Sequence, residues 1–93
     1  MSQGSFEPHP HRAHWDARYR EAYAPRPPSA LLQRWVAHLA PGRALDLACG
    51  TGRNALLLAA HRWRVLGVDI SPVALHIARS EAERCGVELD LLA

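Results

Sequence analysis

The feature that most constrains the fold is the segment 43–69, in which two short apolar runs flank a glycine-rich turn and a stretch rich in alanine and leucine. The first run, 44–48 (ALDLA), enters the turn and is predicted to be a buried strand. The stretch 53–62 (RNALLLAAHR) is too long and too rich in Ala and Leu for a strand, so we expect a helix that begins directly at the turn. The second run, 65–69 (VLGVD), predicts the next strand. This order indicates parallel strands joined by a right-handed crossover.

The flanking residues extend this unit in both directions. Upstream, a helix over 29–39 is predicted from an N-cap at Ser29 and from one apolar face, which would place Trp35 in the core; its members are Leu31, Leu32, Trp35, Val36 and Leu39. Downstream, a second helix is expected from the Ser71–Pro72 start to Gly86, and residues 87–92 begin a third strand. We therefore predict an α/β fold, a Rossmann-like doubly wound parallel sheet that is truncated after about three strands (βαβαβ) and preceded by an N-terminal helix.

The chain divides into two parts at the end of a proline-rich stretch. Residues 1–28 are rich in Pro, His and Arg, and we expect order only around 15–19 (WDARY). There Trp15 and Tyr19 are i, i+4 neighbours that either form a lid helix or pack on the sheet. We expect residues 29–93 to form a single folded domain, because 93 residues provide only one small core.

The composition limits the binding partners and the cellular compartment that we expect for this protein. The net charge of +2 comes from eleven basic residues that are spread without a cluster, so we expect no nucleic-acid partner. No apolar run is long enough to cross a membrane, and we expect no membrane partner. Cys49 and Cys85 form no CxxC pair, which argues against a disulfide framework and favours the cytoplasm. No metal site is predicted, because His9, His11 and His14 lie in the proline-rich tail without a carboxylate or thiol at ligand spacing.

Two carboxylates and two glycines indicate a ligand site at the carboxyl ends of the strands. Gly50 and Gly52 allow a ligand to lie against the main chain, where the N–H groups of the following helix face it. Asp46 and Asp69 emerge at the same sheet edge, and Asp69 has the spacing from the turn at which a carboxylate accepts both hydroxyls of a ribose. We therefore predict a nucleoside-containing ligand.

The turn itself does not distinguish between two cofactor classes. Residues 50–55 (GTGRNA) satisfy the loose dinucleotide pattern G-x-G-x-x-G/A, which is compatible with NAD or with S-adenosylmethionine (SAM). Asp46 would repel a pyrophosphate but attract the ammonium group of a methionyl moiety. Charge therefore favours SAM.

Residues 44–54 and 65–72 (VLGVDISP) together resemble motif I and the following acidic motif of class I SAM-dependent methyltransferases. With 15–19, they are most similar to the tellurite-resistance and thiopurine-like small-molecule methyltransferases. The resemblance implies a SAM-binding domain over 29–93, a small-molecule methyl acceptor and a family sheet of seven strands. Since the chain would end near the third strand, we expect an incomplete enzyme that self-associates or binds a complementing chain through the exposed sheet edge.

The resemblance also assigns the cofactor-binding residues. Asp46 would help to hold the amino acid end of SAM, Asp69 would bind the ribose, and Ile70 would pack on the adenine. Gly50 and Gly52 would line the cofactor.

Two further residues belong to the predicted cofactor-binding set. Ala48 stands where many members of the family have Gly, and we expect its methyl group to be a small perturbation. Arg53 lies in the first turn of a helix, where a cation is disfavoured, so it is either a contact to the SAM carboxylate or a solvated side chain. No catalytic residue is predicted. Cys49 is interpreted as a small buried residue, because direct displacement from SAM needs no thiol.

Three functions remain open at this point. The first is SAM-dependent methyl transfer, with this chain supplying the cofactor-binding half. The second is a catalytically inactive fragment or interaction module derived from a methyltransferase. The third is part of an oxidoreductase that binds NAD(P) or FAD, which Asp46 argues against.

Overall fold

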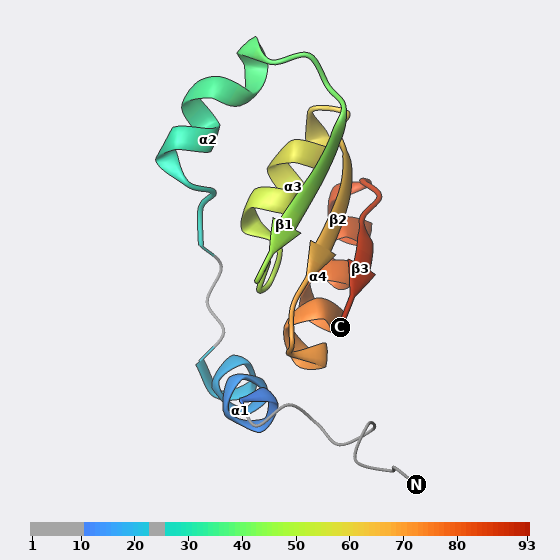
Figure 1. Ribbon diagram of the computed structural model, residues 1–93. Helices are drawn as coiled ribbons and strands as arrows, with labels where there is room; N and C mark the ends of the chain where they lie inside the picture. Colours follow the sequence, from blue (N-terminus) through green and yellow to red (C-terminus); the bar gives the residue numbers. More distant parts are fainter. Residues whose placement is uncertain (1–10, 23–25) are drawn as a thin grey trace, which may run out of the picture.

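The computed structural model describes residues 11–22 and 26–93 (Figure 1). Helices and strands alternate after two N-terminal helices, in the order α1 (Arg12–Ala22), α2 (Ala30–Trp35) with a 3-10 turn η2 (Val36–His38), β1 (Arg43–Leu47), α3 (Arg53–Ala60), β2 (Arg64–Val68), α4 (Pro72–Cys85) and β3 (Asp90–Leu92).

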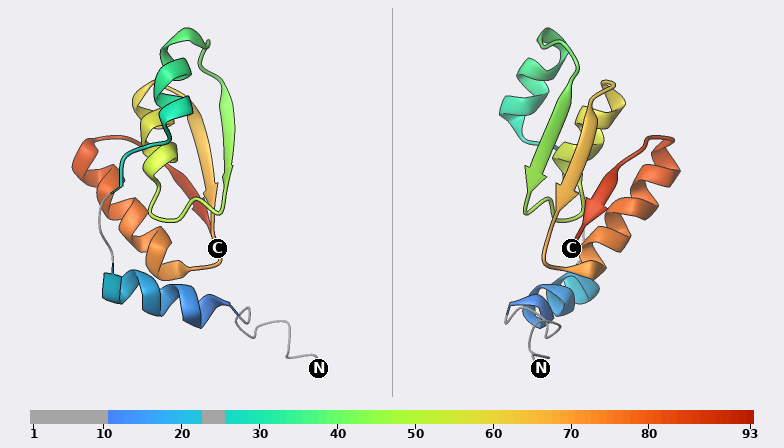
Figure 2. Two further views of the ribbon diagram at one scale, coloured as in Figure 1. Left: turned by 90° about the vertical axis from the view of Figure 1, so that its left-hand side faces the viewer. Right: turned by 45° about the vertical axis from the view of Figure 1, so that its right-hand side comes forward.

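The three strands form one parallel sheet in the order β1-β2-β3, which confirms the predicted α/β class. Asp46 of β1 pairs with Gly67 of β2, and Val68 pairs with Leu92 of β3. Helices α3 and α4 cover the same face of this sheet (Figure 2). A small apolar core fills the space between them and the sheet, built on Ala55, Val65, Ala82 and Leu89.

Local capping explains where the helices begin and end. The hydroxyl of Ser71 accepts a hydrogen bond from the Ala74 N–H at 3.1 Å, and Pro72 occupies the first turn of α4. Gly86 ends α4 in the left-handed conformation, with φ of +72°. Ser29 caps α2 in the same way as Ser71 caps α4, by accepting from the Leu32 N–H at 3.2 Å. Both predicted helix starts are therefore confirmed.

The predicted burial of β1 is wrong. Leu45 and Leu47 are 60% and 68% exposed, because β1 lies at an edge of the sheet and the described part of the chain covers only the opposite face. The helix expected over 29–39 also differs, since its α-helical part ends at Trp35 and the next three residues tighten into η2. Of its apolar face only Val36 is buried, while Trp35 is 47% exposed and lies outside the core.

The third strand is shorter than expected, because residues 87–89 connect α4 to β3 and only 90–92 pair with β2. No helix within 11–22 or 26–93 is long and apolar enough to span a membrane. The same residues contain no group of side chains that could hold a metal ion, and His9 of the histidine set lies outside them.

Candidate functional site

The candidate site forms at the carboxyl ends of β1 and β2, where the glycine turn crosses from β1 to α3. The Cys49 N–H donates to the Val68 carbonyl at 2.9 Å, and the Asp69 N–H donates to the Leu92 carbonyl at 3.1 Å. These two bonds continue the ladder just past the strand ends. The turn and Asp69 are thereby fixed side by side at one edge of the sheet.

The glycines of the turn are required by its geometry. Gly50 has φ of +58°, and a Cβ at this position would lie 2.9 Å from the hydroxyl oxygen of Tyr19. Gly52 has φ of +88°, and its Cβ would lie 3.2 Å from that of Ala78 in α4. Both backbone conformations are ones that side chains disfavour. The turn can therefore lie close to α1 and to α4 only because both positions are Gly.

Asp69 joins the glycine turn to the start of α4. Its Oδ2 accepts from the Gly50 N–H at 2.8 Å, and its Oδ1 accepts from the Ser71 N–H at 2.9 Å. A carboxylate has about four acceptor positions, so each oxygen keeps a lone pair after these two bonds. Asp69 can therefore shape the turn and accept ligand hydroxyls at the same time.

Asp46 carries an unused acceptor. Its Oδ2 is buried and has no hydrogen-bond partner among the described residues. Burial raises the pKa of this carboxyl, with Asp69 adding to the effect, while the backbone N–H of Ala55 and the charge of Arg53 lower it. A buried acceptor without a donor costs free energy. The arrangement therefore favours a ligand that brings a donor to Asp46.

A cavity of about 520 Å³ opens beside the turn. Three predicted site residues line it, Ala48, Asp69 and Ile70. The other lining residues come from α1, β2 and the end of the chain, namely Trp15, Tyr19, Val68 and Ala93. Predicted residues Asp46, Gly50, Gly52 and Arg53 surround the turn without lining this cavity.

Trp15 and Tyr19 of α1, for which the sequence allows either a lid or packing on the sheet, both line the cavity. Their i, i+4 spacing is the sequence signal that places them on one face of α1. The pKa of Tyr19 is raised by burial and by the nearby charge of Asp69. The phenol is therefore a neutral hydrogen-bonding group at neutral pH.

Ala48 departs from the expectation of a small perturbation. Its φ is +53°, in the left-handed region that glycine adopts freely. For a residue with a Cβ this conformation costs roughly 1–2 kcal/mol. The consequence of Ala at this position is backbone strain, which spacing in the sequence does not reveal.

Arg53 and Asn54 attach the preceding segment to the start of α3. The Arg53 Nη1 donates to the Pro27 carbonyl at 3.0 Å, and the Asn54 Oδ1 accepts from the Ser29 N–H at 2.8 Å. Arg53 therefore has a partner within the chain, although its charge still acts on Asp46. A contact from Arg53 to a cofactor carboxylate stays a prediction.

Cys49 is buried, as predicted, with 7% of its surface exposed. Burial raises the pKa of its thiol to about 12, and the carboxylates of Asp46 and Asp69 act in the same direction. The thiol is therefore protonated at neutral pH and unsuited to nucleophilic chemistry.

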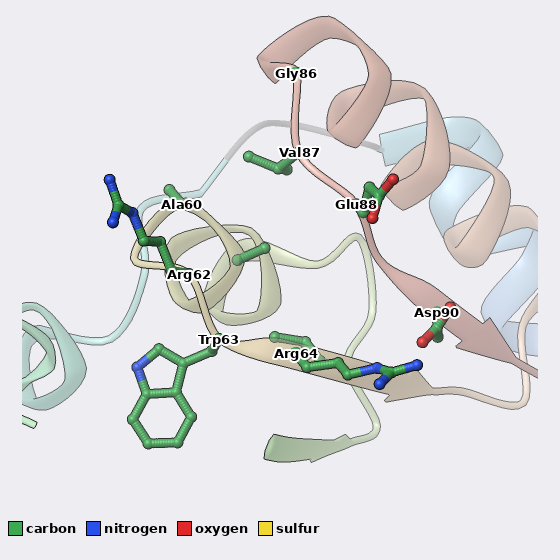
Figure 3. A pocket seen from close by; sticks show the side chains of 10 residues that line it. Ala60, Arg62, Trp63, Arg64, Gly86, Val87, Glu88 and Asp90 are labelled. Atoms are coloured by element: carbon green, nitrogen blue, oxygen red, sulfur yellow. The ribbon is translucent and has the colours of Figure 1, made fainter. Parts of the chain in front are cut away.

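A second cavity, of about 570 Å³, lies at the opposite end of the sheet (Figure 3). Trp63 and Arg64, at the start of β2, extend in different directions, while Glu88 precedes β3 and Asp90 is its first residue. The Nε1 of Trp63 is buried without a hydrogen-bond partner in the part of the chain described. Acidic and basic side chains are mixed here, with Arg64 extending toward the side on which Asp90 lies and Arg62 pointing away from both (Figure 3).

Comparisons with known proteins identify relatives of this arrangement. Residues 44–93 match the family described as "Methyltransferase domain". A 23S rRNA (uracil(747)-C(5))-methyltransferase of Vibrio vulnificus is 37% identical over 59 residues, which are 63% of this chain and 16% of that protein.

Two solved structures share the fold. One is described by the words "Conversion of a Disulfide Bond into a Thioacetal Group during Echinomycin Biosynthesis". It is 32% identical to this chain with a TM-score of 0.76, and the match covers 87% of this chain and 38% of that one. The other is a SAM-dependent methyltransferase from Geobacter sulfurreducens in complex with S-adenosyl-L-homocysteine, 27% identical with a TM-score of 0.63 over 80% of this chain and 32% of its own. The chain thus spans between 16% and 38% of the length of these proteins.

The expectation that excluded nucleic acid is wrong. It rested on the absence of a basic cluster, yet the Vibrio vulnificus relative is named for methylation of 23S rRNA. This chain matches only 16% of that protein, so the charge of the matched segment does not indicate what the whole protein binds.

Proposed function

The chain belongs to the class I SAM-dependent methyltransferase family, and from this premise we propose that its glycine turn and its two strand-end carboxylates bind SAM for methyl transfer. The observation that carries this proposal is that the buried Asp46 Oδ2, unpartnered among the described residues, lies at the same strand ends as the glycine turn and as Asp69, which keeps free lone pairs. Family membership also removes the basis for the NAD(P)- or FAD-dependent alternative, which the turn alone left open.

The residues present fit this cofactor. The ammonium group of its methionyl moiety supplies the donor that the Asp46 oxygen lacks. Asp69 keeps free lone pairs for the two ribose hydroxyls after its bonds to Gly50 and Ser71. Ile70 and Val68 offer apolar surface in the same cavity, which suits an adenine ring.

The proposed roles of the chain are binding and orientation. When bound, SAM supplies an electrophilic methyl group on a sulfonium centre. Gly50 and Gly52 let the main chain approach the cofactor, and the wall formed by Trp15 and Tyr19 keeps water away from it. The protonated thiol of Cys49 takes no part in the transfer.

The relatives differ in acceptor, so the proposal is confined to the donor side of the reaction. One is named for a uracil base of rRNA and another for a disulfide in echinomycin biosynthesis. This chain matches 16% of the first protein and 38% of the second.

A thermal-shift titration tests the proposal. We expect SAM and S-adenosylhomocysteine to raise the melting temperature and NAD to leave it unchanged. At a ligand concentration of 100 Kd the stabilisation is about 2.7 kcal/mol, which is large for a chain of this size. An equal shift with NAD, or no shift with SAM and S-adenosylhomocysteine, would overturn the assignment.

A further inference from the structure

Asp16 is buried, unlike the other charged residues of α1 whose burial is described. It is 9% exposed, whereas most other described side chains of this helix face solvent. Charged residues are seldom buried unless they are paired or hydrogen-bonded. Its position therefore needs a partner outside the helix.

That partner is the first turn of α4. The Asp16 Oδ1 accepts a hydrogen bond from the Ser71 hydroxyl and a second from the Val73 N–H at 3.3 Å. The same Ser71 oxygen accepts from the Ala74 N–H, so both the donor and an acceptor position of the hydroxyl are used. The carboxylate also lies at the positive end of the α4 dipole, which stabilises it there.

A second bond fixes the orientation of α1. The Arg12 Nε donates to the Ile70 carbonyl at 3.2 Å, and Arg12 lies one helical turn before Asp16. Both residues therefore bind the loop between β2 and α4. Trp15 and Tyr19, on the adjacent stripe of the helix, line the cavity.

This attachment shares its residues with the candidate site. Ser71, which holds Asp16, donates through its N–H to Asp69, and Asp69 accepts from Gly50. The Tyr19 hydroxyl in turn lies against Gly50, as the 2.9 Å approach to a Cβ there shows. The contacts form a closed loop from α1 through the β2–α4 turn to the glycine turn and back.

We propose that Asp16 is a positioning residue, which holds α1 in place as one wall of the cofactor cavity through its bonds to the first turn of α4. The role in cofactor binding rests on the proposed function, whereas the attachment of α1 does not. Asp16 itself touches no cofactor in this proposal and acts through Trp15 and Tyr19.

Hydrogen exchange of the full chain without ligand tests the attachment. Asp16→Ala should increase exchange of the α1 amides at least tenfold and also release the Val73 amide, whose acceptor it removes, while the amides of α3, the rest of α4 and the sheet stay unchanged. Asp16→Asn keeps an Oδ1 acceptor and should give an intermediate increase. Arg20→Ala, an exposed residue of the same helix, is the matched control and should change nothing. Unchanged α1 exchange in Asp16→Ala would overturn the proposal.

Calorimetry with S-adenosylhomocysteine tests the consequence for the cavity. We expect Asp16→Ala to weaken binding about tenfold, Asp16→Asn less, and Arg20→Ala less than twofold. Trp15→Ala should weaken binding in the parent chain but add no further loss in the Asp16→Ala background. A purely structural role predicts additive losses instead.

Hydrogen exchange and calorimetry together distinguish a failure of the proposed function from a failure of the positioning role. If the parent chain does not bind S-adenosylhomocysteine, the proposed function fails, and hydrogen exchange still decides whether Asp16 holds α1. If the parent binds and Asp16→Ala binds within twofold of it, or the two losses are additive, the positioning role of Asp16 is wrong.

Discussion

The two ends of the sheet carry cavities of nearly equal volume, about 520 Å³ at the carboxyl ends of the strands and about 570 Å³ at the opposite end. Each end also has one buried polar atom without a partner in the described chain, the Asp46 Oδ2 at one and the Trp63 Nε1 at the other. Each has one non-glycine residue with positive φ, Ala48 or Arg62. Cavity size, an orphaned atom and local strain therefore do not by themselves mark a site.

The two ends differ in how their polar groups are arranged around a common point. At the carboxyl ends, the orphaned acceptor lies beside two glycines in required conformations and a second carboxylate with free lone pairs. At the opposite end, the acidic and basic side chains of the cavity are mixed (Figure 3). The parallel topology produces this asymmetry, because loops that follow the strands meet at one edge.

The largest expected difference between the two ends is in cysteine reactivity. Cys49 lies buried behind the glycine turn with a pKa of about 12, and Cys85 is exposed at the far end of α4. At pH 8 only about one Cys49 thiol in ten thousand is ionised, and burial limits access further. Iodoacetamide followed by mass spectrometry should therefore modify Cys85 at least 100-fold faster than Cys49. Equal rates would show that the turn is open to solvent, and urea should abolish the difference.

The next largest effect is expected at Asp69. Asp69→Ala should weaken S-adenosylhomocysteine binding roughly 10–150-fold, because hydrogen bonds to a charged acceptor contribute roughly 1.5–3 kcal/mol. Asp69→Asn keeps the size but offers one acceptor oxygen in place of two, and its loss should be smaller. Asp90→Ala, in the cavity at the opposite end, is the control and should bind within twofold of the parent by calorimetry. If both Asp69 variants also bind within twofold, Asp69 serves only to join Gly50 to Ser71.

Asp46→Asn is expected to have opposite effects on binding and on stability. Loss of the charge should weaken S-adenosylhomocysteine by about fivefold, or about 1 kcal/mol. In the ligand-free chain the raised pKa means that ionising Asp46 costs stability as the pH rises above its ordinary value of 3.8 toward its folded value. The variant should therefore lose less stability than the parent over that interval and melt higher at neutral pH.

Melting curves between pH 3.5 and 7.5, with and without ligand, measure both effects of Asp46→Asn. A variant that binds as tightly as the parent would contradict the ammonium contact. A parent whose stability relative to the variant does not fall with rising pH would contradict the raised pKa.

The smallest expected effect comes from relieving strain at either end. Ala48→Gly and Arg62→Gly each remove a Cβ from a left-handed conformation, at φ of +53° and +71°. Each should stabilise the chain by about 1 kcal/mol, less the entropy that glycine adds to the unfolded state. Only Ala48→Gly should also change S-adenosylhomocysteine affinity, since Ala48 lines the cavity and Arg62 does not. A lower melting temperature in both variants would show that the strain is absent.

Local sequence signals predicted where α4 begins and ends and in which order the elements follow one another. Ser71, Pro72 and Gly86 specify the start and end of α4 through backbone chemistry that acts over one helical turn. The apolar runs and the glycine turn predicted a parallel βαβαβ unit, which the strand order confirms. The same residues carried the family resemblance, which the match over residues 44–93 confirms.

Exposure, backbone strain and unsatisfied hydrogen-bonding groups followed from packing between distant parts of the chain. The run containing Leu45 and Leu47 looks buried in sequence, yet its exposure depends on what lies on the other face of the sheet. The strain at Ala48 and the unpaired oxygen of Asp46 depend on how the turn closes against neighbouring elements. Asp16 is separated from Ser71 by 55 positions, so no local pattern could predict their bond. Pairing between distant residues depends on packing, and local sequence preferences do not encode it.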